Sequence, residues 1–148
     1  QWQVSPYRSG ESSLIFVEDV TEQRHRERTQ RAELDSATTL LARCAGNPAG
    51  VIAWQLIDGE GLLSRLYVHP GYQGQGIGRA LHDSALRSLA ALGCRRANLW
   101  VLAVNEPAIG IYQHWRWRHV PDAPRAPFGL PERHFVRDLP VAGRTRLG

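Results

Sequence analysis

The chain has 148 residues, 43% of them hydrophobic, and a formal net charge of +4 that is carried by arginine without any lysine. This length suits one domain with one sizeable core, so we expect residues 1–148 to form a single domain. No apolar run approaches the roughly 18 residues of a membrane-spanning helix, and the scattered arginines do not form the basic stripe of a nucleic-acid binder, so neither partner is expected.

The first quarter of the chain is expected to hold an arm, a strand and a polar helix. Residues 1–12 are polar and unpatterned, which indicates an N-terminal arm. Ser13 to Val17 is a short apolar run that predicts a strand. Glu18 to Asp35 is polar and helix-prone, with Thr21 as its expected cap. Its arginines are diluted by glutamates, which favours a solvated helix face over a nucleic-acid patch.

Three strands are expected next. Thr38 to Cys44 and Val51 to Ile57 read as paired strands, separated by the turn sequence Gly46-Asn47-Pro48-Ala49-Gly50. Asp58-Gly59 then predicts a tight hairpin into a third strand, Leu62 to Val68.

A glycine-rich loop and a helix follow this strand directly. Gly74, Gly76 and Gly78 alternate just before an amphipathic run. A helix start leaves four backbone N–H groups without partners and carries the positive end of the helix dipole. Because glycine lets an anion approach the bare backbone, strand, loop and helix together predict a phosphate-binding cradle.

The rest of the chain predicts two helices and further strands. The helix after the glycines has one apolar stripe, with Gly93 just beyond its end. Asn98 to Val104 is a continuous apolar run and therefore a buried strand. A short helix is expected from Pro107 to about Trp115. The members of the stripe are Ile77, Leu81, Ala85, Leu89 and Leu92.

A terminal hairpin completes the expected fold. His119–Val120 and His134–Val136 are its strands, around a proline-rich loop from Pro121 to Pro131. Antiparallel strands come first, and a strand–helix–strand–helix–strand order follows. This order predicts an α/β fold, a mixed and mostly antiparallel central sheet with helices on both faces.

Two familiar phosphate motifs do not fit the glycine loop. The dinucleotide fingerprint G-x-G-x-x-G fails because Arg79 stands at the third glycine position, and the P-loop fails because the chain has no lysine. What remains is Q-x-x-G-x-G at Gln73, Gly76 and Gly78, which resembles the acetyl-CoA motif of the GCN5-related N-acetyltransferases (GNAT family). The alternative is a tight strand-to-helix turn that holds no ligand.

A second motif carries the same resemblance. The strand after the helix ends in N-x-x-A at Asn105 and Ala108, and Tyr112 follows four residues later. The GNAT family usually continues with Gly-Phe, where this chain has Arg116-Trp117, so the next turn is expected to differ. The resemblance covers about residues 38–138.

The resemblance implies acetyl-CoA as cosubstrate, bound where the strands Leu62–Val68 and Asn98–Val104 splay apart at their C-terminal ends. The pantetheine arm would pair with the first strand, and the pyrophosphate would meet the glycine loop. Arg79 would add a charged contact or is an ordinary surface arginine, and Asn105 would bind pantetheine, cap a helix, or do both. The implied binding residues are Leu66, Tyr67, Val68, Gln73, Gly74, Gln75, Gly76, Ile77, Gly78, Arg79, Asn105 and Ala108.

The same resemblance implies transfer of an acetyl group to a primary amine of a small molecule or a peptide. Tyr112 resembles the family's general acid, which protonates the leaving thiolate; the alternative is a core aromatic residue. The general base is not identified, because the strand carries only Ser64 and Arg65 near the site. His69, His119, His134 and a water chain are the candidates. A non-catalytic acyl-CoA sensor or interaction module is the alternative function.

The proline-rich loop gives an expectation for the acceptor, and the cysteines give one for the cellular setting. Arg125, Arg133 and Phe128 in the proline-rich loop, with Trp115 and Trp117 before it, predict an acceptor that bears a carboxylate or phosphate. The alternative is a stiff loop with solvated arginines. The two cysteines lack metal-ligand spacing, which indicates a reduced cytoplasmic protein without a metal site. The sequence leaves a homodimer open.

Overall fold

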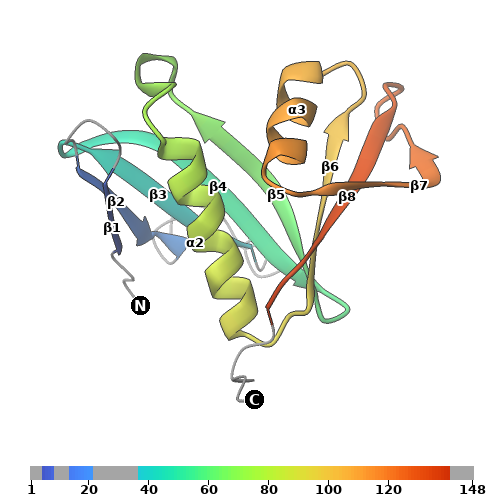
Figure 1. Ribbon diagram of the computed structural model, residues 1–148, viewed down its shortest axis with the longest axis horizontal. Helices are drawn as coiled ribbons and strands as arrows, with labels where there is room; N and C mark the ends of the chain where they lie inside the picture. Colours follow the sequence, from blue (N-terminus) through green and yellow to red (C-terminus); the bar gives the residue numbers. More distant parts are fainter. Residues whose placement is uncertain (1–4, 9–13, 22–36, 141–148) are drawn as a thin grey trace, which may run out of the picture.

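The fold is built on one mixed sheet, which the computed structural model describes for residues 5–8, 14–21 and 37–140 (Figure 1). The sheet has eight strands in the order β1-β2-β3-β4-β5-β6-β8-β7. The strands are β1 Ser5–Arg8, β2 Leu14–Asp19, β3 Thr38–Cys44, β4 Asn47–Ile57, β5 Glu60–Val68, β6 Arg96–Leu102, β7 Arg118–Arg125 and β8 Glu132–Asp138. The helices are α2 Ile77–Ala91 and α3 Glu106–His114, with a 3₁₀ turn at Pro70–Tyr72.

All neighbouring strands are antiparallel except β5 and β6, which are parallel. The expected mixed, mostly antiparallel sheet is therefore confirmed. Helix α2 packs across β2 to β5. Helix α3 lies beside it, since the ring of His82 of α2 is tilted against that of Trp115 at the end of α3, with the ring centres 4.4 Å apart. The described residues place no helix on the other face, so helices on both faces are not confirmed.

The N-terminal region differs from expectation. Strand β1 pairs with β2 inside the segment expected to be an arm. Glu18 and Asp19 continue β2 instead of beginning a helix. The Asp19 carboxylate accepts the Thr21 N–H (2.9 Å), and the N–H groups that Thr21 was expected to cap lie outside the described residues. The rest of the helix expected up to Asp35 lies outside the described residues.

The first hairpin turn is shorter than expected. Strands β3 and β4 are joined by Ala45-Gly46 alone, with φ of +53° and +86°. Two left-handed residues match the twist of a hairpin, so Asn47 to Gly50 join β4 instead of forming the turn. A bulge between Ala42 and Arg43 absorbs the extra residue. The second hairpin turn, Asp58-Gly59, has φ of +53° and +81° as expected.

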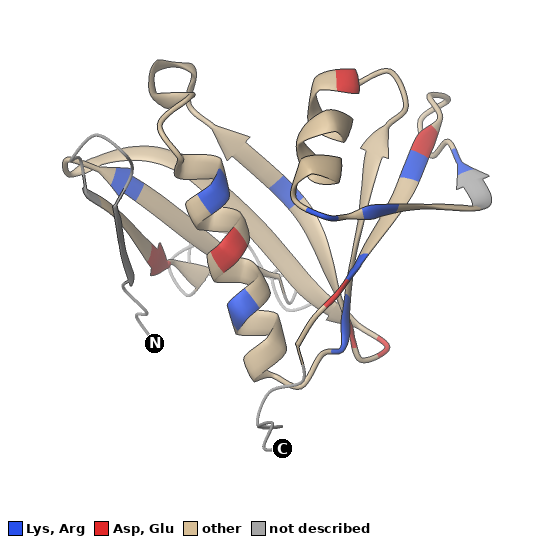
Figure 2. Ribbon diagram, viewed as in Figure 1, with Lys and Arg blue, Asp and Glu red and all other residues tan. Residues whose placement is uncertain are grey.

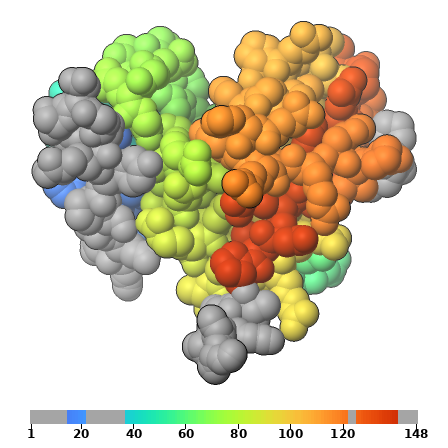
Figure 3. Space-filling view, viewed as in Figure 1, coloured from blue at the N-terminus to red at the C-terminus, as the bar shows by residue number. Residues whose placement is uncertain are grey.

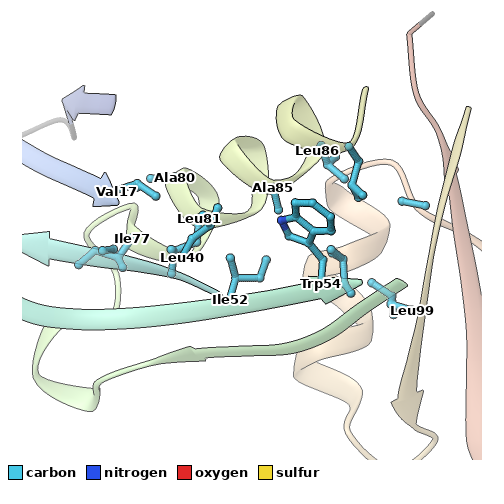
Figure 4. Close-up of a cluster of buried hydrophobic side chains, with 14 of the residues drawn as sticks. Val17, Leu40, Ile52, Trp54, Ile77, Ala80, Leu81, Ala85, Leu86 and Leu99 are labelled. Atoms are coloured by element: carbon cyan, nitrogen blue, oxygen red, sulfur yellow. The ribbon is translucent and has the colours of Figure 1, made fainter. Parts of the chain in front are cut away.

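The core lies between α2 and the sheet (Figure 4). The α2 stripe is confirmed at Ile77, Leu81, Ala85 and Leu89, all buried. Leu92 is 59% exposed, because α2 ends at Ala91 and the chain turns away at Gly93, with φ +92°. From β4, Ile52 and Trp54 pack up against this stripe. The burial of one α2 face therefore fixes the helix across the sheet.

In the C-terminal half, two strands end at other residues than expected. Strand β6 ends at Leu102, and Val104 is 74% exposed in the turn that follows. Strand β7 extends to Arg125, so the proline-rich loop shrinks to residues 126–131. No described helix is long and apolar enough to span a membrane.

Candidate active site

The sheet opens between its two parallel strands. β5 and β6 pair only through Gly61 with Ala97, Leu62 with Asn98 and Leu63 with Leu99. Beyond these pairs β5 stays on β4 and β6 stays on β8, so the two halves of the sheet separate (Figure 1). The expected splay is confirmed. It leaves the β6-facing edge of β5 from residue 64 to residue 68 without a described strand beside it.

A cleft of about 550 Å³ fills this opening on the side of the two helices. It is the hollow between the green loop before α2 and the orange α3 in Figure 3. The walls come from β5, the glycine loop, the start of α2 and one face of α3. Its lining residues are Leu66, Val68, Tyr72, Gln73, Gly74, Gly76, Ile77, Gly78, Arg79, Ala108, Ile111, Tyr112 and Trp115.

The loop delivers bare backbone N–H groups to the cleft. Gly74 and Gly76 have φ of +83° and +86°, a conformation that favours glycine. Gly76 is the N-cap of α2 and supplies no side-chain bond. The first N–H to bond back within the helix is that of Ala80, to the Gly76 carbonyl (3.0 Å). The N–H groups of residues 77–79 thus lack intrahelical partners and suit an anion.

Hydrogen bonds hold the loop against the sheet. The His69 N–H donates to the Ala49 carbonyl (2.7 Å), and His69 Nδ1 accepts the Gly71 N–H (3.0 Å). The Gln73 side-chain amide donates to the Val68 carbonyl (3.4 Å). Because the Nδ1 lone pair of His69 is used in the turn, this histidine acts structurally and is a poor candidate for the general base.

Tyr112 forms part of the α3 wall. It is half-buried, with the rings of Trp115 and Trp117 each 6.1 Å away in edge-to-face contact. Burial raises the pKa of its phenol above the usual value of 10.0. The phenol therefore keeps its proton at neutral pH and is able to donate it to a group in the cleft.

Three residues that the resemblance implied for binding do not line the cleft. Tyr67 alternates with Leu66 and Val68 along β5 and is 53% exposed. Gln75 accepts a hydrogen bond from the thiol of Cys44 (Sγ–Oε1 3.9 Å). Asn105 caps α3, with Oδ1 accepting the Ala108 N–H (3.3 Å), which confirms the capping alternative.

The sequence interpretation missed Tyr72 and Ile111 as cleft residues and assigned Trp115 to the acceptor rim. A signal for two of them was present: Ala108, Ile111, Tyr112 and Trp115 have the 3–4–7 spacing of one helix face. They all line the cleft. The motif had singled out only the first and third members of this face.

Arg79 combines two contacts at the mouth of the cleft. Its Nε lies 3.1 and 3.2 Å from the two carboxylate oxygens of Asp83. Its guanidinium lies 5.6 Å from the centre of the Trp115 ring. A ligand phosphate at the start of α2 would compete with Asp83 for this cation.

Of the residues predicted to surround the acceptor, Trp115 lines this cleft, whereas Arg125, Phe128, Arg133 and Trp117 do not. Arg125 pairs with Glu132 (2.7 Å) and lies 4.1 Å over the Trp100 ring, so its charge is compensated within the hairpin. Phe128 is 89% exposed at the tip, and Trp117 is buried in the core. The arginines of the described residues are spread over several elements and form no single basic stripe (Figure 2).

Two further histidines were candidates for the base. His119 contacts the ring of Phe135, with the ring centres 5.3 Å apart. His134 Nε2 lies 2.8 Å from Asn98 Oδ1, and its ring stacks on Trp100. Neither lines the cleft. The general base remains unassigned among the described residues.

Comparison with known proteins identifies the family. The model of the acetyltransferase (GNAT) family matches residues 3–116. The chain belongs to this family. A mycothiol acetyltransferase of Beutenbergia cavernae is 44% identical over 66 residues, 45% of this chain and 22% of that protein. The chain thus spans about a fifth of that relative's length.

Solved structures of GNAT acetyltransferases share the fold. The IAA acetyltransferase from Bacillus cereus has a TM-score of 0.69 at 15% identity, covering 84% of this chain and 99% of that one. The PaiA N-acetyltransferase from Thermoplasma acidophilum, solved in complex with coenzyme A, has a TM-score of 0.60 at 20% identity. It covers 75% of this chain and 66% of that one.

Proposed function

We propose that this chain is an acetyl-CoA-dependent N-acetyltransferase, with the cleft between β5, α2 and α3 as its cosubstrate site. One observation carries the proposal: the sheet splays beyond Leu63 and Leu99, and the opening is lined by both an uncapped helix N-terminus and Tyr112. An extended, phosphate-bearing thioester fits that combination. Family membership and the PaiA complex with coenzyme A support it.

The chain's own residues suit the two ends of such a cosubstrate. The N–H groups of residues 77–79 would bind the pyrophosphate, with the Arg79 guanidinium beside them. The backbone of Leu66 and Val68 would pair with the pantetheine amides, because no described strand occupies that edge. Apolar and aromatic side chains complete the wall beside the pantetheine arm and would displace water from it. They are those of Tyr72, Ile111 and Trp115.

The reaction needs two proton movements. The acceptor amine would attack the thioester carbonyl, which forms the C–N bond and a tetrahedral intermediate, and this intermediate would collapse as the C–S bond breaks. The Tyr112 phenol would give its proton to the departing sulfur, whose thiol has an ordinary pKa of about 8.5. The proton lost by the amine leaves through solvent or a base outside the cleft lining. The acceptor is a primary amine on a small molecule or a peptide.

A non-catalytic acyl-CoA-binding module is the second candidate. It is favoured by one observation: among the described residues, no Asp, Glu or His lines the cleft to serve as general base. Both functions require the cosubstrate to bind, and only the first releases thiol.

Thiol release from acetyl-CoA in the presence of an amine panel tests the proposal. The panel contains amino acids, amino-sugar phosphates, polyamines and peptides with a free N-terminal alanine. Amine-dependent release, with an acetylated product in the mass spectrum, is the expected result. Binding of coenzyme A without release from any amine would favour the binding module. Absence of binding would overturn both.

A further inference from the structure

His82 lies inside the helix–sheet core although it is polar. It is 1% exposed, on the face of α2 that meets α3. Its Nε2 lies 2.9 Å from Trp117 Nε1, and its Nδ1 lies 2.9 Å from Asp83 Oδ1. Its ring is tilted against Trp115, with the ring centres 4.4 Å apart. Both ring nitrogens of the imidazole therefore have hydrogen-bond partners, and its ring contacts an indole.

These contacts settle the protonation of the ring. An indole N–H is a donor only, so His82 Nε2 must accept the hydrogen bond from Trp117. The remaining proton is then on Nδ1, where it is donated to the Asp83 carboxylate. A doubly protonated ring would place a second N–H against that of Trp117 and break this buried hydrogen bond.

His82 does not line the cleft itself but contacts Trp115, which does. Trp115 lines the cleft, and both the His82 ring (4.4 Å) and the Arg79 guanidinium (5.6 Å) lie close to the centre of its ring. The Trp115 ring also lies against the start of α2, since a Cβ added to Gly78 would be 3.7 Å from the Cη2 atom of Trp115. The position of Trp115 in the cleft wall thus depends on the contacts of His82 with Trp115 and Trp117.

Charged groups near His82 come from its own helix, α2, and from strand β8. Asp83 and Arg79 come from α2, and Arg137 comes from β8, where its Nε donates to the Trp115 carbonyl (3.0 Å). From α3, the nearby titratable group is the Tyr112 phenol, which contacts Trp115 and Trp117. Burial is the largest effect and lowers the pKa of His82 below 6.5; Asp83 opposes it, and the two arginines add to it.

We propose that the neutral His82 imidazole is a positioning residue for the cosubstrate cleft, holding Trp117 by its Nε2 and Trp115 by its ring. Protonation of His82 releases the Trp117 indole, loosens the Trp115 wall and weakens the binding of coenzyme A in acid. This rests on the proposed function, because it takes the cleft to be the coenzyme A site.

The test is the dissociation constant of coenzyme A, measured by calorimetry from pH 5 to pH 8 with the full chain. Three proteins are compared: wild type, His82→Gln and His114→Gln. The Oε1 of glutamine can replace Nε2 as acceptor for Trp117, but glutamine does not titrate. His114 ends α3 and is exposed, so His114→Gln is the matched control. Titration of the ligand's own phosphates cancels when variant and wild type are compared at each pH.

Between neutral and acid pH, the affinity for coenzyme A should fall in wild type and in His114→Gln. The factor of this fall should be about ten times larger than in His82→Gln. At neutral pH, His82→Gln binds nearly as well as wild type. An affinity ratio between His82→Gln and wild type that is constant over the whole range would overturn the inference and leave the proposed function standing. A wild type that binds no coenzyme A at any pH would overturn both.

Trp117→Phe provides a second route that does not require His82→Gln to fold. Without the indole N–H there is no buried hydrogen bond for protonation of His82 to break, so the acid loss of affinity should be smaller in Trp117→Phe than in wild type. The indole N–H resonance of Trp117, assigned by its absence in Trp117→Phe, should move with pH in the same range as the affinity. An acid loss of affinity that is unchanged in Trp117→Phe would contradict the proposal.

Discussion

Leu63 of β5 and Leu99 of β6 are the last parallel pair before the two strands separate. Both side chains are buried, at 7% and 3% exposed, and belong to the core under α2. The next inward-facing residues of β5, Leu66 and Val68, already line the cleft. The Leu63–Leu99 pair therefore joins the hydrophobic core to the base of the candidate site.

Leu99→Ala should lower the free energy of unfolding by about 2–5 kcal/mol, the usual cost of removing a large buried aliphatic side chain. Leu92→Ala is the control, because Leu92 is 59% exposed beyond the end of α2. Its effect should stay within about 0.5 kcal/mol. Urea unfolding followed by circular dichroism measures both. Equal losses in the two variants would show that the core does not extend to the base of the splay.

Local patterns predicted those parts of the fold whose conformation is set locally. The Asp58-Gly59 turn and the α2 stripe follow from backbone freedom and helical period, and both are present. The Ala45-Gly46 turn was missed because the turn-rich sequence after it is drawn into β4 by pairing with β3. Pairing with the neighbouring strand overrides local turn preference there.

The candidate site was predictable only in part for the same reason. The glycine loop and Tyr112 belong to contiguous motifs and line the cleft. Trp115 and His82 meet through the packing of α3 on α2, which no spacing within either helix shows. The alternation along β5 could have excluded the Tyr67 side chain, which lies between two cleft residues and therefore points to the other face.

A negative charge placed in the cradle should weaken the binding of coenzyme A. In Gly78→Glu the new Cβ meets Val68 and Trp115 at ordinary contact distances of 3.5 and 3.7 Å, so the fold should tolerate it. The carboxylate, however, would repel the phosphates. Like charges placed together cost several kcal/mol, so affinity should fall by about a hundredfold.

Gly110→Glu is the matched control for charge and helix propensity. It lies on α3 outside the cleft lining, and nothing lies within 4 Å of an added Cβ. Calorimetry should give it nearly the wild-type affinity. If both glutamate variants bind coenzyme A equally well, the phosphates do not sit at the start of α2.

The buried His82 should make the stability of the fold depend on pH. Its folded-state pKa is lowered, chiefly by burial, so between that pKa and 6.5 the unfolded chain binds more protons than the folded one. The contribution of His82 is thus fully present above about pH 6.5 and is lost as the pH falls through the folded-state pKa. The slope for one proton is at most about 1.4 kcal/mol per pH unit.

His82→Gln removes this titration. The free energy of unfolding of wild type should fall more steeply than that of His82→Gln between pH 6.5 and pH 5, measured by urea unfolding at each pH. The carboxylates and exposed histidines contribute to both proteins and cancel in the difference. Parallel curves would mean that His82 has the same pKa in the folded and the unfolded chain.

Tyr112→Phe should separate chemistry from binding. The ring and its contacts with Trp115 and Trp117 are kept, so the fold and the affinity for coenzyme A should change little. Loss of a general acid typically lowers kcat by about 10²–10⁴-fold. Because burial raises the pKa of the phenol above 10.0, wild-type turnover should show no alkaline loss due to Tyr112 below that pH. Thiol release from acetyl-CoA measures both effects.

Tyr72→Phe controls for the loss of a hydroxyl from the same cleft, since Tyr72 also lines it but lies on the loop before α2. Its kcat should stay near the wild-type value, because its hydroxyl is assigned no proton transfer. If Tyr112→Phe and Tyr72→Phe both turn over like wild type across the pH range, Tyr112 is a packing residue. Solvent is then the expected source of the proton for the leaving thiolate, since no described Asp, Glu or His lines the cleft.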